Sequence, residues 1–140
     1  MHRRTMALVV ALAVLGASGL ATGCSSLNFV KRRLPPPTQT TDGVRFVFYA
    51  PSARVVQLMG SWPENNWGAG QAQTGSFLVG AMTDPTNSGV WQRVEPLPPG
   101  RYQYKFLIDR VNWKEDPNNP NRTDDGYGGF NSIIDVRDLR

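Results

Sequence analysis

LPPGRYQYKFLI, at residues 97–108, combines the signals of a turn and of a strand. The turn comes first, because proline presets φ and glycine supplies positive φ. Tyr102, Tyr104 and Phe106 then alternate with Gln103 and Lys105. This period of two predicts a β-strand with the three aromatic rings in a core and Lys105 on the opposite face.

Similar short segments lie on both sides of this strand. Val44, Phe46 and Phe48 repeat the period of two, and Asp109-Arg110 suits a tight reversal. No stretch of the sequence has the apolar stripe and the caps of a helix. Seven short strands, separated by Gly, Pro and Asn turns over about 100 residues, predict an all-β sandwich. The predicted strands are 44–49, 55–59, 77–82, 91–95, 102–108, 111–113 and 132–136.

The composition limits what the domain can do. The chain has 140 residues and a net charge of +4, but from Asp42 onward ten basic and eleven acidic side chains give −1. A nucleic-acid-binding surface is therefore not expected. The only histidine is His2 and the only cysteine is Cys24. Residues 25–140 thus lack the side chains for Ser-His-Asp or Cys-His catalysis, for a His/Cys zinc site and for a disulfide.

The N-terminus has the organisation of a secretion signal. Arg3 and Arg4 precede an uncharged run at 6–21, which is short for a membrane-spanning helix and suits a signal peptide. Small residues then lead to Cys24, as in a bacterial lipobox, with Ala21 where that motif prefers leucine. We therefore predict a signal peptide at 1–23 and acylation of Cys24. The alternative is a secreted protein with a free thiol.

The segment 24–41 is expected to be a tether between the acylated cysteine and a domain at 42–140. It is basic at 31–33, and three consecutive prolines at 35–37 favour an extended chain. Two or more acyl chains anchor a protein stably to a membrane. The sequence therefore predicts a lipid-anchored protein of the bacterial cell envelope, at the outer membrane where the host has one. The domain would lie on the periplasmic or extracellular side.

Three spaced segments carry a resemblance to a known family. They are APSA, VVQLMGSW and NNW within 50–67; LPPGRYQYKF followed by Asp109, Trp113, Asp116 and Pro117; and GGFNSIIDV at 128–136. Together they resemble the early-set, immunoglobulin-like β-sandwich of family 48 carbohydrate-binding modules. That family includes the glycogen-binding domain of AMP-activated kinase β subunits and the N-terminal domains of isoamylase-like enzymes. The resemblance covers about residues 42–137.

The resemblance implies a carbohydrate site of five residues. In glycogen-binding members two tryptophans form a platform for glucose rings, a lysine and an asparagine bond the sugar hydroxyls, and a loop residue lies across the platform. The matching residues are Trp67 and Trp113, Lys105, Asn131 and Tyr127. The chain departs from the pattern at Gly129, where a hydroxyl residue is usual, and at 63–64, where it has an insertion.

The chemistry of these residue types agrees with the resemblance. A pyranose has an apolar C–H face, which a flat aromatic ring covers, and a rim of hydroxyls, which amide and ammonium groups bind. Each residue also has a structural alternative. Either tryptophan could pack in the core, as we expect for Trp62 and Trp91. Lys105 could be an ordinary solvated side chain, Asn131 a turn residue and Tyr127 a plain loop residue.

The sequence therefore predicts non-catalytic binding of α-1,4-glucan. The alternative is a module that docks onto a separate glycan-active enzyme or another envelope protein. Hydrolysis would need two carboxyl groups about 5–10 Å apart across a cleft, and Asp124 and Asp125 are merely sequence neighbours. The oxygen-rich segment 116–125 suggests calcium, but Pro120 breaks the alternating register of such a loop. No metal or other cofactor is expected.

Overall fold

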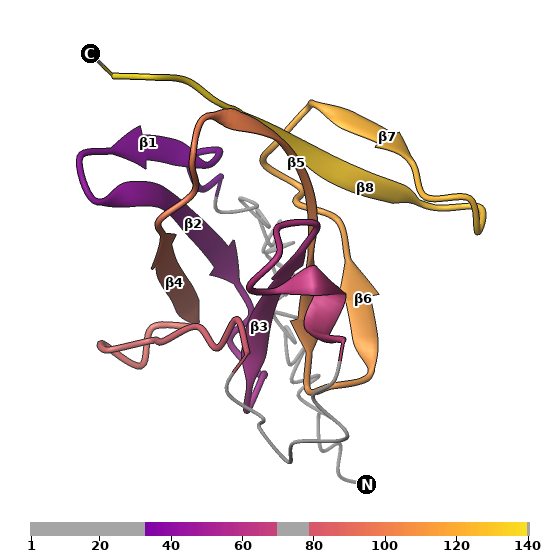
Figure 1. Ribbon diagram of the computed structural model, residues 1–140. Helices are drawn as coiled ribbons and strands as arrows, with labels where there is room; N and C mark the ends of the chain where they lie inside the picture. Colours follow the sequence, from indigo (N-terminus) through magenta and orange to yellow (C-terminus); the bar gives the residue numbers. More distant parts are fainter. Residues whose placement is uncertain (1–32, 70–78, 140) are drawn as a thin grey trace, which may run out of the picture. The chain divides into compact units, whose positions relative to one another are not determined.

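The computed structural model describes residues 33–69 and 79–139 (Figure 1). The predicted signal peptide, Cys24 and the first half of the predicted tether (24–32) lie outside these residues. Within them, no helix is long and apolar enough to cross a membrane. The described elements are β1 (Thr38–Thr40), β2 (Gly43–Tyr49), β3 (Val56–Gly60), a 3-10 turn η1 (Asn66–Gly68), β4 (Val90–Glu95), β5 (Gly100–Ile108), β6 (Asn112–Lys114), β7 (Arg122–Asp124) and β8 (Phe130–Val136).

The strands form two antiparallel sheets. The smaller sheet has the order β1-β2-β4, and the larger has the order β3-β5-β8-β7 with β6 paired to β5. β5 is the centre of the larger sheet because it pairs with three strands, β3, β6 and β8. The predicted all-β, immunoglobulin-like sandwich is confirmed.

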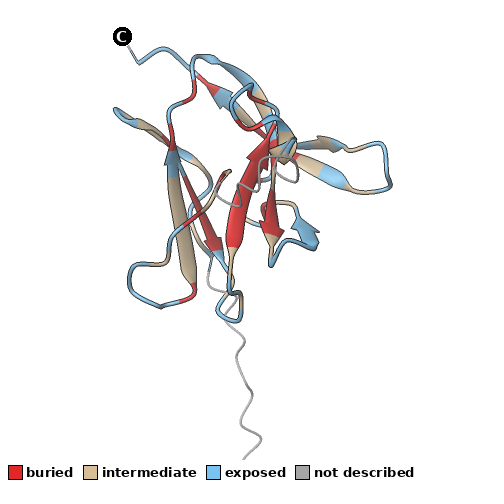
Figure 2. Ribbon diagram, turned by 60° about the horizontal axis from the view of Figure 1, so that its bottom comes forward, coloured by how far each residue is buried: buried red, intermediate tan, exposed pale blue. Residues whose placement is uncertain are grey.

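The core lies between the two sheets, and buried residues gather in the facing strands (Figure 2). Phe46 of β2 meets Tyr104 of β5 edge to face at 4.9 Å between ring centroids, and Phe48 meets Phe106 at 4.4 Å. The alternation predicted for β5 is therefore correct. Trp62 is also buried, as expected.

Trp91 is only half-buried, and it packs against the edge of the core. Its Nε1 donates a hydrogen bond to the carbonyl oxygen of Ala50 at 3.0 Å. The amphipathic indole thus contributes packing area, while its polar atom finds a partner in the residue that directly follows β2.

The reversal between β5 and β6 has the geometry that the sequence predicts. Asp109 and Arg110 have φ values of 49° and 64°, and the amide of Val111 donates to the oxygen of Ile108 at 3.1 Å. Two positive φ values define the type I′ turn that matches strand twist. Asp109 Oδ1 also accepts the backbone amide of Val55 at 3.0 Å, which ties this hairpin to the residue preceding β3.

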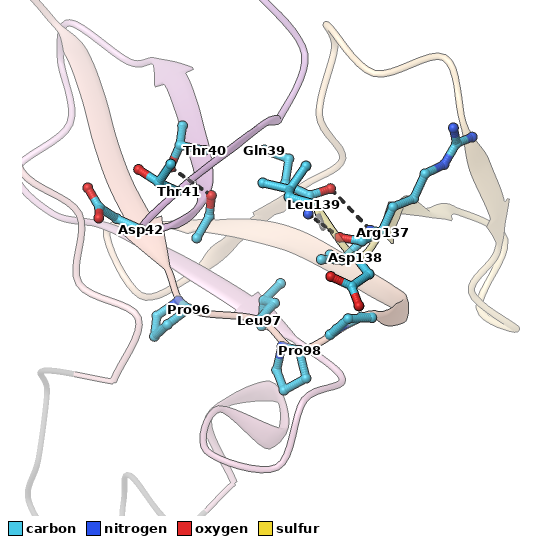
Figure 3. A pocket seen from close by; sticks show the side chains of 13 residues that line it. Gln39, Thr40, Thr41, Asp42, Pro96, Leu97, Pro98, Arg137, Asp138 and Leu139 are labelled. Carbon is cyan, nitrogen blue, oxygen red and sulfur yellow. Dashed lines mark hydrogen bonds between the residues drawn. The ribbon is translucent and has the colours of Figure 1, made fainter.

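Regular structure begins before the predicted boundary at residue 42. β1 lies within the segment predicted as a tether and pairs with β2. The side chain of Gln39 makes two hydrogen bonds to the backbone of Arg137, as a neighbouring strand would. Its Oε1 accepts from the amide nitrogen, and its Nε2 donates to the carbonyl oxygen (Figure 3). Leu34 donates its amide to Asn118 Oδ1 at 3.2 Å. The proline run obscured this edge strand in the sequence.

Two further strand predictions differ from the structure. β7 has three residues and was not predicted, because its polar sequence Arg-Thr-Asp has no apolar alternation. The strand predicted at 77–82 lies partly outside the described residues. Its described part is not a regular strand. It forms an isolated bridge between Ala81 and Gln57, with backbone hydrogen bonds joining Gly80 and Met82 to β3, and the next bridge joins Thr83 to Gln92. This segment therefore passes from the larger sheet to the smaller one.

Candidate functional site

Three of the predicted site residues share the outer face of the larger sheet. Side chains alternate along β5, so Lys105 points away from the core that Tyr104 fills. Trp113 on β6 lies directly opposite Leu107, which is on the same face of β5 as Lys105. The register of β8 places Asn131 on this face as well.

Trp67 reaches the same face from η1, which lies against β3 (Figure 1). Its ring centroid is 6.4 Å from that of Trp113, and the two ring planes meet at 56°. Trp113 is 46% exposed and Trp67 is half-buried. Neither belongs to the hydrophobic core. The two tryptophans, called the tryptophan platform below, therefore form one aromatic surface from two distant segments.

The turn that carries Trp67 is strained and firmly held. Asn66 and Trp67 have φ values of 40° and 55°, a left-handed conformation that costs roughly 1–2 kcal/mol per residue. The buried Asn65 holds the turn, because its Oδ1 accepts the amide of Gly60 and its Nδ2 donates to the oxygen of Leu58, both at 2.8 Å. Strain of this kind persists only where surrounding contacts enforce it, and it clusters at binding sites.

Lys105 is not the ordinary solvated lysine of the alternative interpretation. Its Nζ lies 2.5 Å from Asp125 Oδ2, and the side chains of the pair are only 15% and 10% exposed. The hydrogen bond from Lys105, with those from the amides of Tyr127 and Gly129, lowers the pKa of Asp125 to about 2. Because an ammonium group has three donors, the ion pair leaves Lys105 able to bind a further acceptor.

Tyr127 stands at the tip of the loop between β7 and β8. It is 96% exposed. Gly126 and Gly128 on either side have φ values of 78° and 83°, which glycine adopts without steric cost. The ring is therefore presented to solvent, and its position depends on the backbone of the loop.

Asn131 lies inside β8, so the alternative of a turn residue is wrong. Its Nδ2 donates to Gln103 Oε1 at 2.8 Å. By the strand register, Asn131 shares the outer face of the larger sheet with Gln103 and Lys105. Sequence reasoning did not select Gln103, although its place in the alternation of β5 was the available signal.

Asn65 and Asp125 were also missed as site-forming residues. Neither is expected to touch a sugar. Asn65 bonds the backbone of strand β3, and Asp125 bonds backbone amides of its own loop. The available signals were an asparagine pair directly before Trp67 and the Asp-Gly-Tyr-Gly-Gly sequence at 125–129. Asparagine and aspartate in such contexts commonly bond local backbone amides.

The carboxylates of 116–125 serve the fold of this part of the chain. Asp116 is buried, which raises its pKa, and its Oδ2 accepts the hydroxyl of Tyr104 at 2.7 Å. Asp124 Oδ1 accepts the amide of Gly126 at 2.6 Å. Among the described residues, no group of three or more His, Cys, Asp or Glu side chains could hold a metal ion.

A cavity of about 350 Å³ lies elsewhere, at the end of the sandwich (Figure 3). It is bordered by the turn between β1 and β2, by the segment 96–99 and by the C-terminal segment 136–139. None of the five predicted site residues lines it. The candidate site is therefore separate from this cavity.

A family model for the glycogen recognition site of AMP-activated protein kinase matches residues 44–140. The chain belongs to this family. The match includes all five predicted site residues of the glycogen-recognition domain, and the resemblance inferred from the three sequence segments is confirmed at the level of the family. The family is a carbohydrate-binding module, a class of domain that is typically non-catalytic. No curated protein matches the chain.

Proposed function

We propose that this glycogen-recognition domain binds α-1,4-linked glucan on the outer face of its larger sheet, without catalysis. The proposal rests on one observation, the approach of Trp67 and Trp113 to 6.4 Å with their planes at 56°. Successive glucose units of an α-1,4 chain turn relative to one another, so two inclined rings can each cover one sugar face. A straight β-1,4 chain would suit coplanar rings better.

The rest of the site would bind the hydroxyl rim. Lys105 and Asn131 lie beside the platform on the same face, and Tyr127 would cover the ligand from the loop tip. One shallow site of this kind gives weak affinity. We expect a Kd of about 10 μM to 1 mM, which corresponds to roughly −7 to −4 kcal/mol.

The direct test is a titration of tryptophan fluorescence in the purified protein. We expect a saturable shift with maltoheptaose and with β-cyclodextrin, because Trp67 and Trp113 report the ligand themselves. Cellohexaose, which has the same units in β linkage, serves as the control and should give no shift. If none of the sugars shifts the spectrum, glucan binding is ruled out and docking onto a protein partner becomes the better account of this face.

We also propose that the protein is anchored in the bacterial envelope through acylation of Cys24. Support comes from Arg3 and Arg4, from the uncharged run at 6–21 and from the small residues before the cysteine. Expressed in a bacterial host, the wild-type protein should incorporate labelled palmitate and sediment with membranes. Cys24→Ala should do neither. Membrane sedimentation of the alanine variant would contradict the lipid anchor.

A further inference from the structure

Both carboxylate oxygens of Asp125 accept hydrogen bonds from other residues of the candidate site. Oδ2 pairs with Lys105 Nζ at 2.5 Å, and Oδ1 accepts the amides of Tyr127 at 2.8 Å and of Gly129 at 2.9 Å. The amide of Asp125 also donates to the oxygen of Gly129 at 3.1 Å, which closes the loop on itself. Hydrogen bonds to an ionised group are about twice as strong as neutral ones.

Gly129 fits this arrangement closely. A Cβ atom added at residue 129 would lie 2.7 Å from Asp125 Oδ2, which is closer than side-chain contacts allow. The departure from the family pattern at Gly129 therefore has a physical reason in this chain. The space beside residue 129 is occupied by the carboxylate that holds Lys105.

The loop tip depends on this carboxylate for its order. A Cβ added at Gly126 or Gly128 would have no atom within 4 Å, so the tip stands clear of the sheet. Three of the five residues 125–129 are glycines, which lose the most backbone entropy when they become fixed. Anchoring the loop before the ligand arrives removes that cost from binding.

We propose that Asp125 is a positioning residue of the glucan site. It holds the Lys105 ammonium group on the outer face and fixes the loop that presents Tyr127, so that both are placed before sugar binds. This inference rests on the proposed function and adds a residue that does not contact the sugar itself.

The test compares Asp125→Asn with Asp124→Asn in the purified full-length protein. Both variants lose one negative charge from neighbouring positions, and the Asp124 variant keeps an oxygen that can accept the amide of Gly126. We expect Asp125→Asn to weaken the affinity for maltoheptaose about tenfold, which is the lower end of what one hydrogen bond to a charged group contributes. Asp124→Asn should change it less than about twofold.

Amide hydrogen exchange without sugar measures the loop directly. In Asp125→Asn the amides of Tyr127 and Gly129 should exchange faster than in the wild type, and in Asp124→Asn they should not. A double-mutant cycle with Tyr127→Ala gives a further readout. The loss caused by Asp125→Asn should shrink when Tyr127 is already alanine, because part of it acts through that ring.

The outcomes separate this inference from the proposed function. If the wild type fails to bind maltoheptaose, the proposed function is wrong, and so is this role of Asp125. If the wild type binds and Asp125→Asn binds equally well, or exchange at the two amides is unchanged, the positioning role alone is overturned. Equal losses in both aspartate variants would also overturn it, because they would reflect charge rather than the anchored loop.

Discussion

Replacing either Trp67 or Trp113 by alanine is expected to abolish measurable glucan binding while the domain stays folded. Truncation of a central aromatic anchor typically costs at least about 2 kcal/mol of binding free energy, and a site of this class has only roughly 4–7 kcal/mol in total. The affinity should therefore fall by at least about 30-fold. Isothermal titration calorimetry with maltoheptaose measures the affinity, and urea unfolding of the same samples measures the stability, so the two effects can be told apart.

The structure explains why stability should survive this change. Trp113 is 46% exposed on a three-residue strand, and Trp67 sits on a surface turn outside the hydrophobic core. Each substitution should cost no more than about 1 kcal/mol of unfolding free energy. Because the two rings contact each other, the double variant should lose less affinity than the sum of the single losses.

Trp91→Phe is the matched control for the platform variants. Trp91 lies on β4 of the smaller sheet, and phenylalanine would remove only its hydrogen bond to Ala50 and part of its ring. Its glucan affinity should equal that of the wild type. Wild-type affinity in Trp67→Ala and in Trp113→Ala would show that the two rings do not bind the sugar.

The features that the sequence predicts correctly are those that depend on local pattern. The alternation of Tyr102, Tyr104 and Phe106 fixes the two faces of β5 wherever the strand is placed in the fold. The Asp109-Arg110 reversal follows from local turn geometry in the same way. The meeting of Trp67 with Trp113 is different, because only the resemblance to a family connected two segments so far apart.

The features that the sequence did not predict depend on tertiary contacts between residues that are far apart in the chain. Asp124 and Asp125 are adjacent and chemically identical, yet one caps a glycine amide and the other pairs with Lys105. Asp124 is the last residue of β7 and Asp125 the first of the loop that follows, and no residue pattern reveals which one faces the lysine. Gln39 is similar, since its strand-like bonds to Arg137 join the two ends of the domain.

Trp62→Ala is expected to destabilise the domain severely, in contrast to Trp67→Ala five residues later. Trp62 is 1% exposed and packs against Phe46 and Tyr102, with ring centroids 6.4 Å and 6.3 Å away. Truncating a buried tryptophan to alanine costs about 3–5 kcal/mol through lost burial and the cavity left behind. A domain of this size has only about 5–15 kcal/mol in total.

Trp62→Phe tests whether the loss comes from the buried volume. Phenylalanine keeps an aromatic ring in the core, and it lacks Nε1, which is buried without a hydrogen-bond partner among the described residues. Removing a buried unpaired donor offsets part of the lost packing. Trp62→Phe should therefore retain clearly more of the unfolding free energy than Trp62→Ala in urea titrations.

The opposite effects at Trp62 and Trp67 would show that stability and recognition are divided within a single turn. The carbonyl oxygen of Trp62 accepts the amides of Asn65 and Asn66, so the backbone of this residue fixes the start of the segment that carries Trp67. Folded Trp62→Phe should consequently bind maltoheptaose within about twofold of the wild type, because the backbone of the turn is kept. A stable Trp62→Ala variant, with a loss below about 1 kcal/mol, would contradict the burial of this ring.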